Sequence, residues 1–139
     1  NEALDGRSLP EIREVIAAMV RAFLEGPLSD AERRCHIQLM QRELADPGEA
    51  LNMVVGEVMR PYIQELTGLI RARLDFDVPD ERLRLWVLGV LGMTLYFFFA
   101  RPAVSQLMGR EYDEGFKSNL ISYIAAFAID GISALAEEH

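Results

Sequence analysis

The sequence has few of the residues that carry catalysis or bind metals. Its 139 residues contain one cysteine, Cys35, and two histidines, His36 and His139. A single cysteine excludes an internal disulfide framework and suits a reducing compartment, so a cytoplasmic location is expected. No zinc-ligand spacing, glycine-rich phosphate loop or Ser/His/Asp constellation is found. We therefore expect no enzyme, no metal site and no cofactor.

Positive charge is also scarce, since 14 Lys and Arg residues face 22 Asp and Glu residues, for a net charge of −8. Such an acidic surface repels phosphate backbones, so this segment alone is not expected to bind nucleic acid. Half of the residues are hydrophobic, which argues against disorder, and the length fits a single domain over residues 1–139. The chain begins at Asn1 without an initiator Met or a signal peptide, as expected of a processed protein or an excised domain.

Strand-like alternation of polar and apolar residues is missing, whereas helical spacing is nearly continuous. The caps and breakers predict an all-α fold with five main helices, at about 8–26, 29–46, 49–74, 79–108 and 113–138. Pro61 is expected to kink the third helix without ending it, because apolar spacing continues beyond the proline. Arg101-Pro102 should kink the fourth helix, and Gly109 should end it.

The last two helices are apolar on too many sides for one core. Residues 85–100 and 120–132 are almost entirely apolar, whereas a surface helix normally has one apolar stripe. Sixteen uncharged residues between Arg84 and Arg101 are fewer than the ~20 of a membrane span, so no membrane association is expected. One side of each helix is predicted to meet a second copy of the chain in a four-helix interface. The expected interface residues are Leu91, Phe99, Phe116, Leu120, Tyr123, Phe127 and Gly131.

Three short segments carry a family resemblance. They are residues 36–40 (His-Ile-Gln-Leu-Met) followed by Arg42-Glu43 and Pro47, then 59–62 (Met-Arg-Pro-Tyr), and finally the run from Gly92 to Pro102. In this order they resemble the C-terminal ligand-binding and dimerisation domain of the TetR family of transcriptional repressors, in particular the subgroup whose C-terminal domain is called CerR-like. The resemblance spans Leu9 to Leu135.

The resemblance implies a transcriptional regulator whose DNA-binding helix-turn-helix lies upstream and is absent from this chain. Such proteins dimerise through their last two helices, forming a four-helix bundle. They bind small, largely apolar effectors among the earlier helices and the fourth helix, and binding releases the operator DNA. Operator DNA is thus expected as a partner only through the missing N-terminal domain.

Candidate ligand contacts are polar, aromatic or flexible side chains beside the apolar stripes. Tyr62 is the best placed, because the kink at Pro61 opens space and the phenol offers a polar group. For the methionines and His36, the alternative is an ordinary place in the core. The complete candidate set is His36, Met40, Met59, Tyr62, Trp86, Met93 and Tyr96.

Two other functions remain open. A helical dimer that binds another protein, with no small-molecule ligand, would have the same apolar faces. Those faces could also cover a larger domain outside this sequence. The sequence thus favours a ligand-sensing dimer and does not identify the effector.

Overall fold

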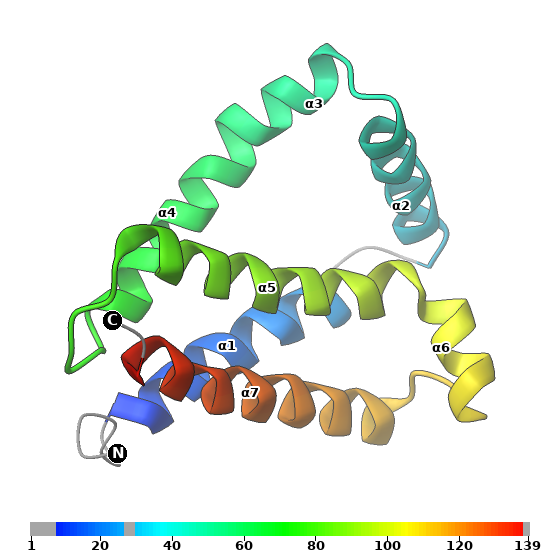
Figure 1. Ribbon diagram of the computed structural model, residues 1–139. Helices are drawn as coiled ribbons and strands as arrows, with labels where there is room; N and C mark the ends of the chain where they lie inside the picture. Colours follow the sequence, from blue (N-terminus) through cyan, green and yellow to red (C-terminus); the bar gives the residue numbers. More distant parts are fainter. Residues whose placement is uncertain (1–7, 27–29, 138–139) are drawn as a thin grey trace.

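The structure is a computed structural model that describes residues 8–26 and 30–137. These residues form helices joined by short turns and contain no strand, which confirms the predicted all-α class (Figure 1). In chain order the elements are α1 (Ser8–Leu24), α2 (Asp30–Ala45), α3 (Glu49–Val54), the π-helical turn η2 (Val55–Met59), α4 (Arg60–Arg71), α5 (Asp80–Phe99), α6 (Arg101–Met108) and α7 (Glu114–Glu137).

The described residues divide into more helices than the five expected, because two of the expected helices change geometry midway. The third becomes α3, η2 and α4, which follow one another without a break. The fourth is divided at Ala100 into α5 and α6. The predicted interruptions at the two prolines are therefore confirmed in place, although the count of five is not.

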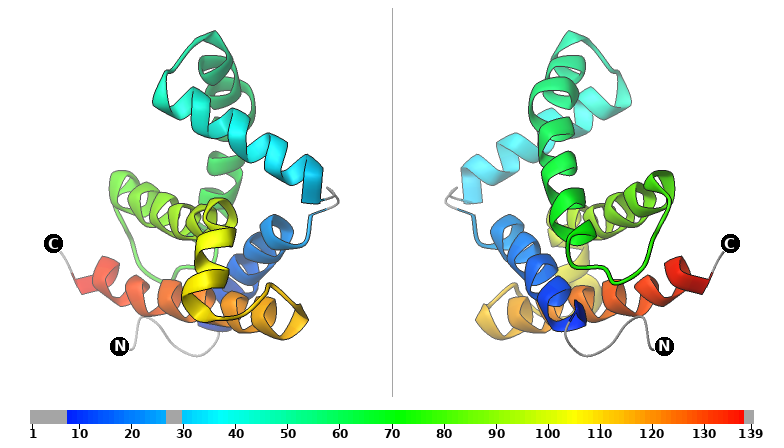
Figure 2. Two further views of the ribbon diagram at one scale, coloured as in Figure 1. Left: turned by 90° about the vertical axis from the view of Figure 1, so that its right-hand side faces the viewer. Right: turned by 90° about the vertical axis from the view of Figure 1, so that its left-hand side faces the viewer.

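The core lies where α1, α5 and α7 meet (Figure 2). Ile12, Ile16 and Val20 form one stripe of α1 at helical spacing and are fully buried. Ile124 and Ile132 of α7 are also fully buried. Burial of each such side chain contributes about 1.5–3 kcal/mol, so these three helices provide most of the stability of the chain.

We call α2, α3 and η2 together the outer arm. The arm lies on the opposite side of α5 from α7 and, with α4 and α5, outlines a triangle (Figures 1 and 2). No residue of α3 or η2 is buried, and no described side chain of α2 is buried. Few buried apolar contacts mean low local stability, so we expect the arm to open more easily than the core formed by α1, α5 and α7.

Pro61 explains the π-helical turn. Its nitrogen has no hydrogen to donate, and its ring would collide with the carbonyl of Glu57 in a regular α-helix. The backbone widens just before the proline, so that the amide of Arg60 donates to the oxygen of Val55, five residues earlier. The helix then continues as α4, as predicted. A π-turn of this kind often marks a functional site.

A glycine ends α6 in the predicted way. Gly109 has a φ of 64°, in the left-handed region that favours glycine. Its amide donates to the oxygen of Gln106 at 3.3 Å, and the amide of Arg110 donates to the oxygen of Ser105 at 3.1 Å. This pair of bonds is a Schellman motif, and it turns the chain toward α7.

The Gly109→Ala variant should be less stable than the wild type by about 1 kcal/mol, because alanine must adopt a strained positive φ. Gly68→Ala is the matched control. Gly68 lies inside α4, and a Cβ added there would meet no atom within 4 Å, so alanine should stabilise the protein by about 0.5–1 kcal/mol. The measurement is urea unfolding of both variants. Stabilisation by both substitutions would contradict the role assigned to Gly109.

Among the helices in the two described ranges, α5 alone is long and apolar enough to cross a membrane by length and composition. Core helices of soluble proteins meet the same criterion. Only 28% of its apolar window is buried, so much of the apolar surface of α5 is exposed in the single chain.

Candidate functional site

An apolar cavity of about 430 Å³ lies between the outer arm and the core. Its walls come from α1, α2, α3, η2, α4 and α5, and the side chains that line it carry almost no polar atoms. A volume of 300–1,000 Å³ is usual for small-molecule sites. The lining residues are Ala22, Phe23, Met40, Val54, Val58, Met59, Tyr62, Ile63, Leu91 and Leu95.

Several of the apolar side chains that line the cavity are exposed to solvent in the single chain. Val58 is 62% exposed and Val54 is 40% exposed, although both are apolar. Among the described lining residues, Tyr62 alone carries a hydroxyl group. Partial burial, followed by the nearby Glu65 carboxylate, raises the pKa of this phenol. The phenol therefore stays neutral and can donate a hydrogen bond. The cavity thus suits a ligand with an apolar body.

The structure brings together three of the seven predicted ligand residues. Met40, Met59 and Tyr62 all line the cavity, from α2, η2 and α4. Their contact with a ligand remains a prediction.

The other four predicted ligand residues lie elsewhere. His36 is exposed on α2, and Met93 packs against the core. Trp86 is half-buried between α5 and α7, where its Nε1 donates to the oxygen of Ala128 at 3.1 Å. Tyr96 is 51% exposed, with its ring 5.3 Å from that of Phe97.

Sequence reasoning missed most of the apolar wall. Phe23 closes the cavity from α1, and Leu91 and Leu95 close it from α5. Their positions depend on how these helices cross, which helical spacing alone does not give. Val54 and Val58 could have been found, because they lie one turn apart on the same apolar stripe as Tyr62.

A second apolar surface lies on α5 and α7. We call it the α5/α7 face and define it by Leu85, Leu88, Tyr96, Tyr123 and Phe127, each at least 45% exposed. The rings of Tyr123 and Phe127 lie 6.1 Å apart. Monomers rarely expose this many large apolar side chains on two adjacent helices.

The predicted interface residues divide between this face and the core. Tyr123 and Phe127 are exposed, and Phe99 is half-buried. Gly131 is half-buried, and a side chain added there would meet the Trp86 indole at 3.4 Å. The remaining three, Leu91, Phe116 and Leu120, are 6–7% exposed within the single chain, so little of their surface is left for a second copy.

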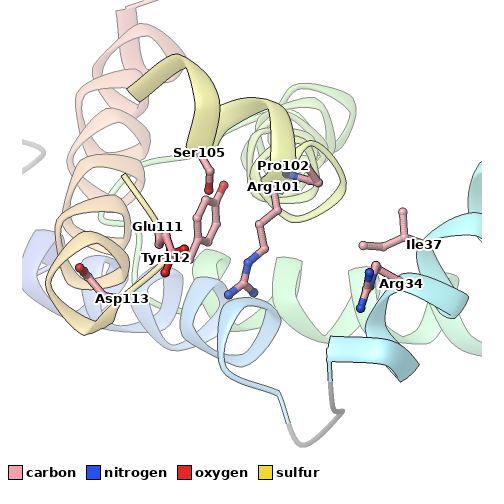
Figure 3. A pocket seen from close by; sticks show the side chains of 8 residues that line it. All are labelled: Arg34, Ile37, Arg101, Pro102, Ser105, Glu111, Tyr112 and Asp113. Atoms are coloured by element: carbon pink, nitrogen blue, oxygen red, sulfur yellow. The ribbon is translucent and has the colours of Figure 1, made fainter. Parts of the chain in front are cut away.

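A polar cavity of about 480 Å³ lies between the start of α2, the start of α6 and the α6–α7 turn (Figure 3). The Arg101 guanidinium lies 4.6 Å from the centre of the Tyr112 ring. Tyr112 donates its hydroxyl hydrogen to the oxygen of Phe97 at 2.8 Å, tying the end of α5 to the turn. Burial raises the pKa of Tyr112, although the charge of Arg101 opposes the shift.

Asp113, on the same turn, caps α7. Its carboxylate accepts the amide of Phe116 at 2.8 Å and the guanidinium of Arg110 at 3.0 Å. The amide, followed by Arg110, lowers the pKa of this carboxyl below its usual value. Asp113 therefore stays ionised at neutral pH, with its charge engaged at the helix start.

The described residues contain no group of three or more His, Cys, Asp or Glu side chains that could hold a metal ion. Cys35 and His36 are both exposed on α2.

Comparison with known proteins and families identifies the family of this chain. Searches of curated proteins and of solved structures found no match. Residues 12–136 match the family described as "HTH-type transcriptional dual regulator CecR, C-terminal domain". The match covers nearly the whole chain, from α1 to the end of α7, and confirms the expected class of domain. The chain therefore belongs to the family of C-terminal domains of the helix-turn-helix transcriptional regulator CecR.

Proposed function

We propose that the chain is the effector-sensing and homodimerisation domain of a TetR-like transcriptional repressor of the CerR-like subgroup, acting in the cytoplasm. The apolar cavity of about 430 Å³ carries this proposal. A small, largely apolar effector binds there, and DNA is bound through a helix-turn-helix domain upstream of this chain.

The cavity is well placed to respond to a ligand. It joins the stable core, through Leu91 and Leu95, to the outer arm, through Met40 and Val58. A ligand that fills it gives exposed apolar side chains of the arm a partner, and each buried CH₂ group contributes about 0.8 kcal/mol. Binding therefore draws the arm toward α5.

The route toward the DNA-binding domain passes through α1. Ala22 and Phe23 line the cavity from the last turns of this helix, and the Phe23 ring packs edge-on against Phe98 at 6.3 Å. The opposite end of α1 begins at Ser8, and the proposed DNA-binding segment would precede it. A shift of α1 caused by the ligand would therefore move that segment and release the operator.

The dimer forms through the α5/α7 face. Two copies related by a two-fold axis bury Leu85, Leu88, Tyr96, Tyr123 and Phe127 of each chain in a four-helix bundle. A homodimer interface of about 2,000 Å² or more would cover this face. The symmetry places the two upstream domains at a separation that ligand binding changes.

Thermal unfolding against a panel of apolar compounds, together with sedimentation equilibrium, tests the proposal. We expect a dimer at micromolar concentration whose melting temperature rises with at least one compound. A dimer that responds to no apolar compound would support the alternative, a helical interaction module without a ligand. A monomer would remove the proposed assembly.

The Pro61→Ala variant should bind an apolar ligand about 5- to 10-fold more weakly. Alanine restores the missing amide donor, so η2 relaxes toward an α-helix and rotates Val58 and Met59 relative to the cavity. Dimerisation should not change, because the α5/α7 face lies elsewhere. Pro10→Ala in α1 is the control, since Pro10 is exposed and does not line the cavity. Equal loss of affinity in both variants would contradict this role of the π-turn.

A further inference from the structure

We infer that Tyr62 determines the length of the effector, because its ring separates the apolar cavity from a second groove into which a longer ligand would extend. This inference rests on the proposed function and names the residue that selects among apolar ligands by size.

The second groove, which we call the α1/α4 groove, has a volume of about 350 Å³. Its walls are mostly apolar side chains of two helices, namely Val15, Ala18 and Met19 of α1 and Tyr62, Leu66 and Leu69 of α4. Among the described residues that line either space, only Tyr62 lines both the groove and the apolar cavity. The two spaces therefore adjoin at the Tyr62 side chain.

The groove and the apolar cavity follow the same pair of helical segments. On α1 the lining passes from Ala18 in the groove to Ala22 in the cavity, one helical turn later. On the facing segment it passes from Leu66 in the groove to Met59 in the cavity, with Tyr62 between them. A chain-like ligand that crosses the position of Tyr62 would thus continue along α1 from the cavity into the groove.

The Tyr62 ring is the main obstacle on this path. Ala18 and Ala22 are four residues apart and so share a face of α1, and neither side chain extends beyond Cβ. Partial burial, followed by the Glu65 carboxylate, raises the pKa of the Tyr62 phenol. Because Glu65 lines the groove and not the cavity, the phenol reaches toward the groove. The ring therefore spans the boundary between the two spaces.

This boundary limits the ligands that the wild-type protein accepts. A cavity of about 150 Å³ is large enough for benzene, so the 430 Å³ of the apolar cavity suits a ligand of up to roughly three times that size. A longer ligand meets the ring. Without the ring, further CH₂ groups would be buried against the apolar walls of the groove, and each would raise the affinity about fourfold.

The test measures the affinity of straight-chain alcohols, from 1-hexanol to 1-dodecanol, by isothermal titration calorimetry. The affinity of the wild type should rise about fourfold per CH₂ group up to a limiting length and no further. For Tyr62→Ala the rise should continue past this limit, so that the next longer alcohol binds at least about 10-fold more tightly than to the wild type. Tyr62→Phe keeps the ring and should keep the wild-type limit.

A second substitution shows whether the added carbons lie in the groove. Ala18 is exposed and lines the groove but not the cavity, so a phenyl ring at this position would fill the groove without disturbing the core. Ala18→Phe combined with Tyr62→Ala should return the limiting length to that of the wild type. Ala18→Phe alone should leave the affinity for 1-octanol within about twofold of the wild-type value.

The outcomes separate this inference from the proposed function. The same limit in wild type and Tyr62→Ala, no limit in the wild type, or a longer limit that Ala18→Phe does not reverse would overturn the role of Tyr62 and leave the effector site intact. Failure of every alcohol to bind the wild type would overturn the effector site itself, and with it this inference.

Tyr62 is 38% exposed, so Tyr62→Ala should fold normally, and circular dichroism checks that it does. If Tyr62→Ala has lost its helical signal, Tyr62→Val provides the same test with a smaller cavity in its place. The limiting length of this variant should also exceed that of the wild type, and an unchanged limit would overturn the inference.

Discussion

The Phe127→Glu variant is expected to be a monomer at protein concentrations where the wild type is a dimer. Phe127 is 55% exposed in the single chain, and the proposed interface buries it. Two glutamates, one from each copy, would then be buried without partners, and a single such charge costs about 3–5 kcal/mol. The dissociation constant should rise by at least about 100-fold, which sedimentation equilibrium measures.

The control for this variant is Leu107→Glu. Leu107 lies on α6 and is 80% exposed, so the change from an apolar side chain to a charge is the same, outside the α5/α7 face. This variant should sediment like the wild type. If Leu107→Glu dissociates the dimer and Phe127→Glu does not, the interface involves α6 in place of the middle of α7.

The Val58→Asp variant is expected to lose at least about 100-fold in affinity for an apolar ligand and to fold normally. Val58 is 62% exposed, so a carboxylate there remains in water in the empty protein. An apolar ligand in the cavity would cover this charge, and desolvation without a partner costs several kcal/mol. Isothermal titration calorimetry measures the loss, and the melting temperature of the unliganded protein shows that folding is unchanged.

Met53→Asp is the matched control, because Met53 is 61% exposed on the adjacent α3 and does not line the cavity. It should bind ligand like the wild type. Equal losses in the two variants would indicate a general effect of negative charge on the outer arm, and would contradict the position of the ligand.

The sequence was most informative where a single residue sets the backbone. Gly109 requires a positive φ, and Pro61 and Pro102 each remove an amide donor, so the end of α6 and the two interruptions could be predicted from residue type alone. The π-helical form of the turn before Pro61 could not. Whether a helix widens before a proline depends on the backbone conformation of several neighbouring residues together.

The division between core and open face could not be predicted on helices that are apolar all round. Leu120 and Tyr123 are both apolar residues of α7, yet Leu120 is 6% exposed and Tyr123 is 56% exposed. Composition does not distinguish them, because either side of the helix would satisfy the hydrophobic effect. The choice follows from the way α1 and α5 pack against α7, which is a property of the whole chain.

The residues that line the apolar cavity could likewise be predicted only in part. Met40, Met59 and Tyr62 were found because kinks and flexible side chains have local signals. Phe23 and Leu95 have none, since both look like ordinary core residues of their own helices. Trp86 was predicted to contact the ligand from its residue type, but it lies outside the cavity. Its indole packs against α7 and donates a hydrogen bond to the carbonyl of Ala128.

The most direct test of the central claim, that an apolar effector binds between the outer arm and the core, is a methyl NMR titration with 1-octanol. The protein, labelled with ¹³C at its methionine methyl groups, has six methionines. Met40 and Met59 line the cavity, whereas Met53 and Met108 are exposed outside it. Binding should shift the signals of Met40 and Met59 and leave those of Met53 and Met108 unchanged. Shifts confined to Met53 or Met108, or no saturable shift at any methionine, would contradict the account.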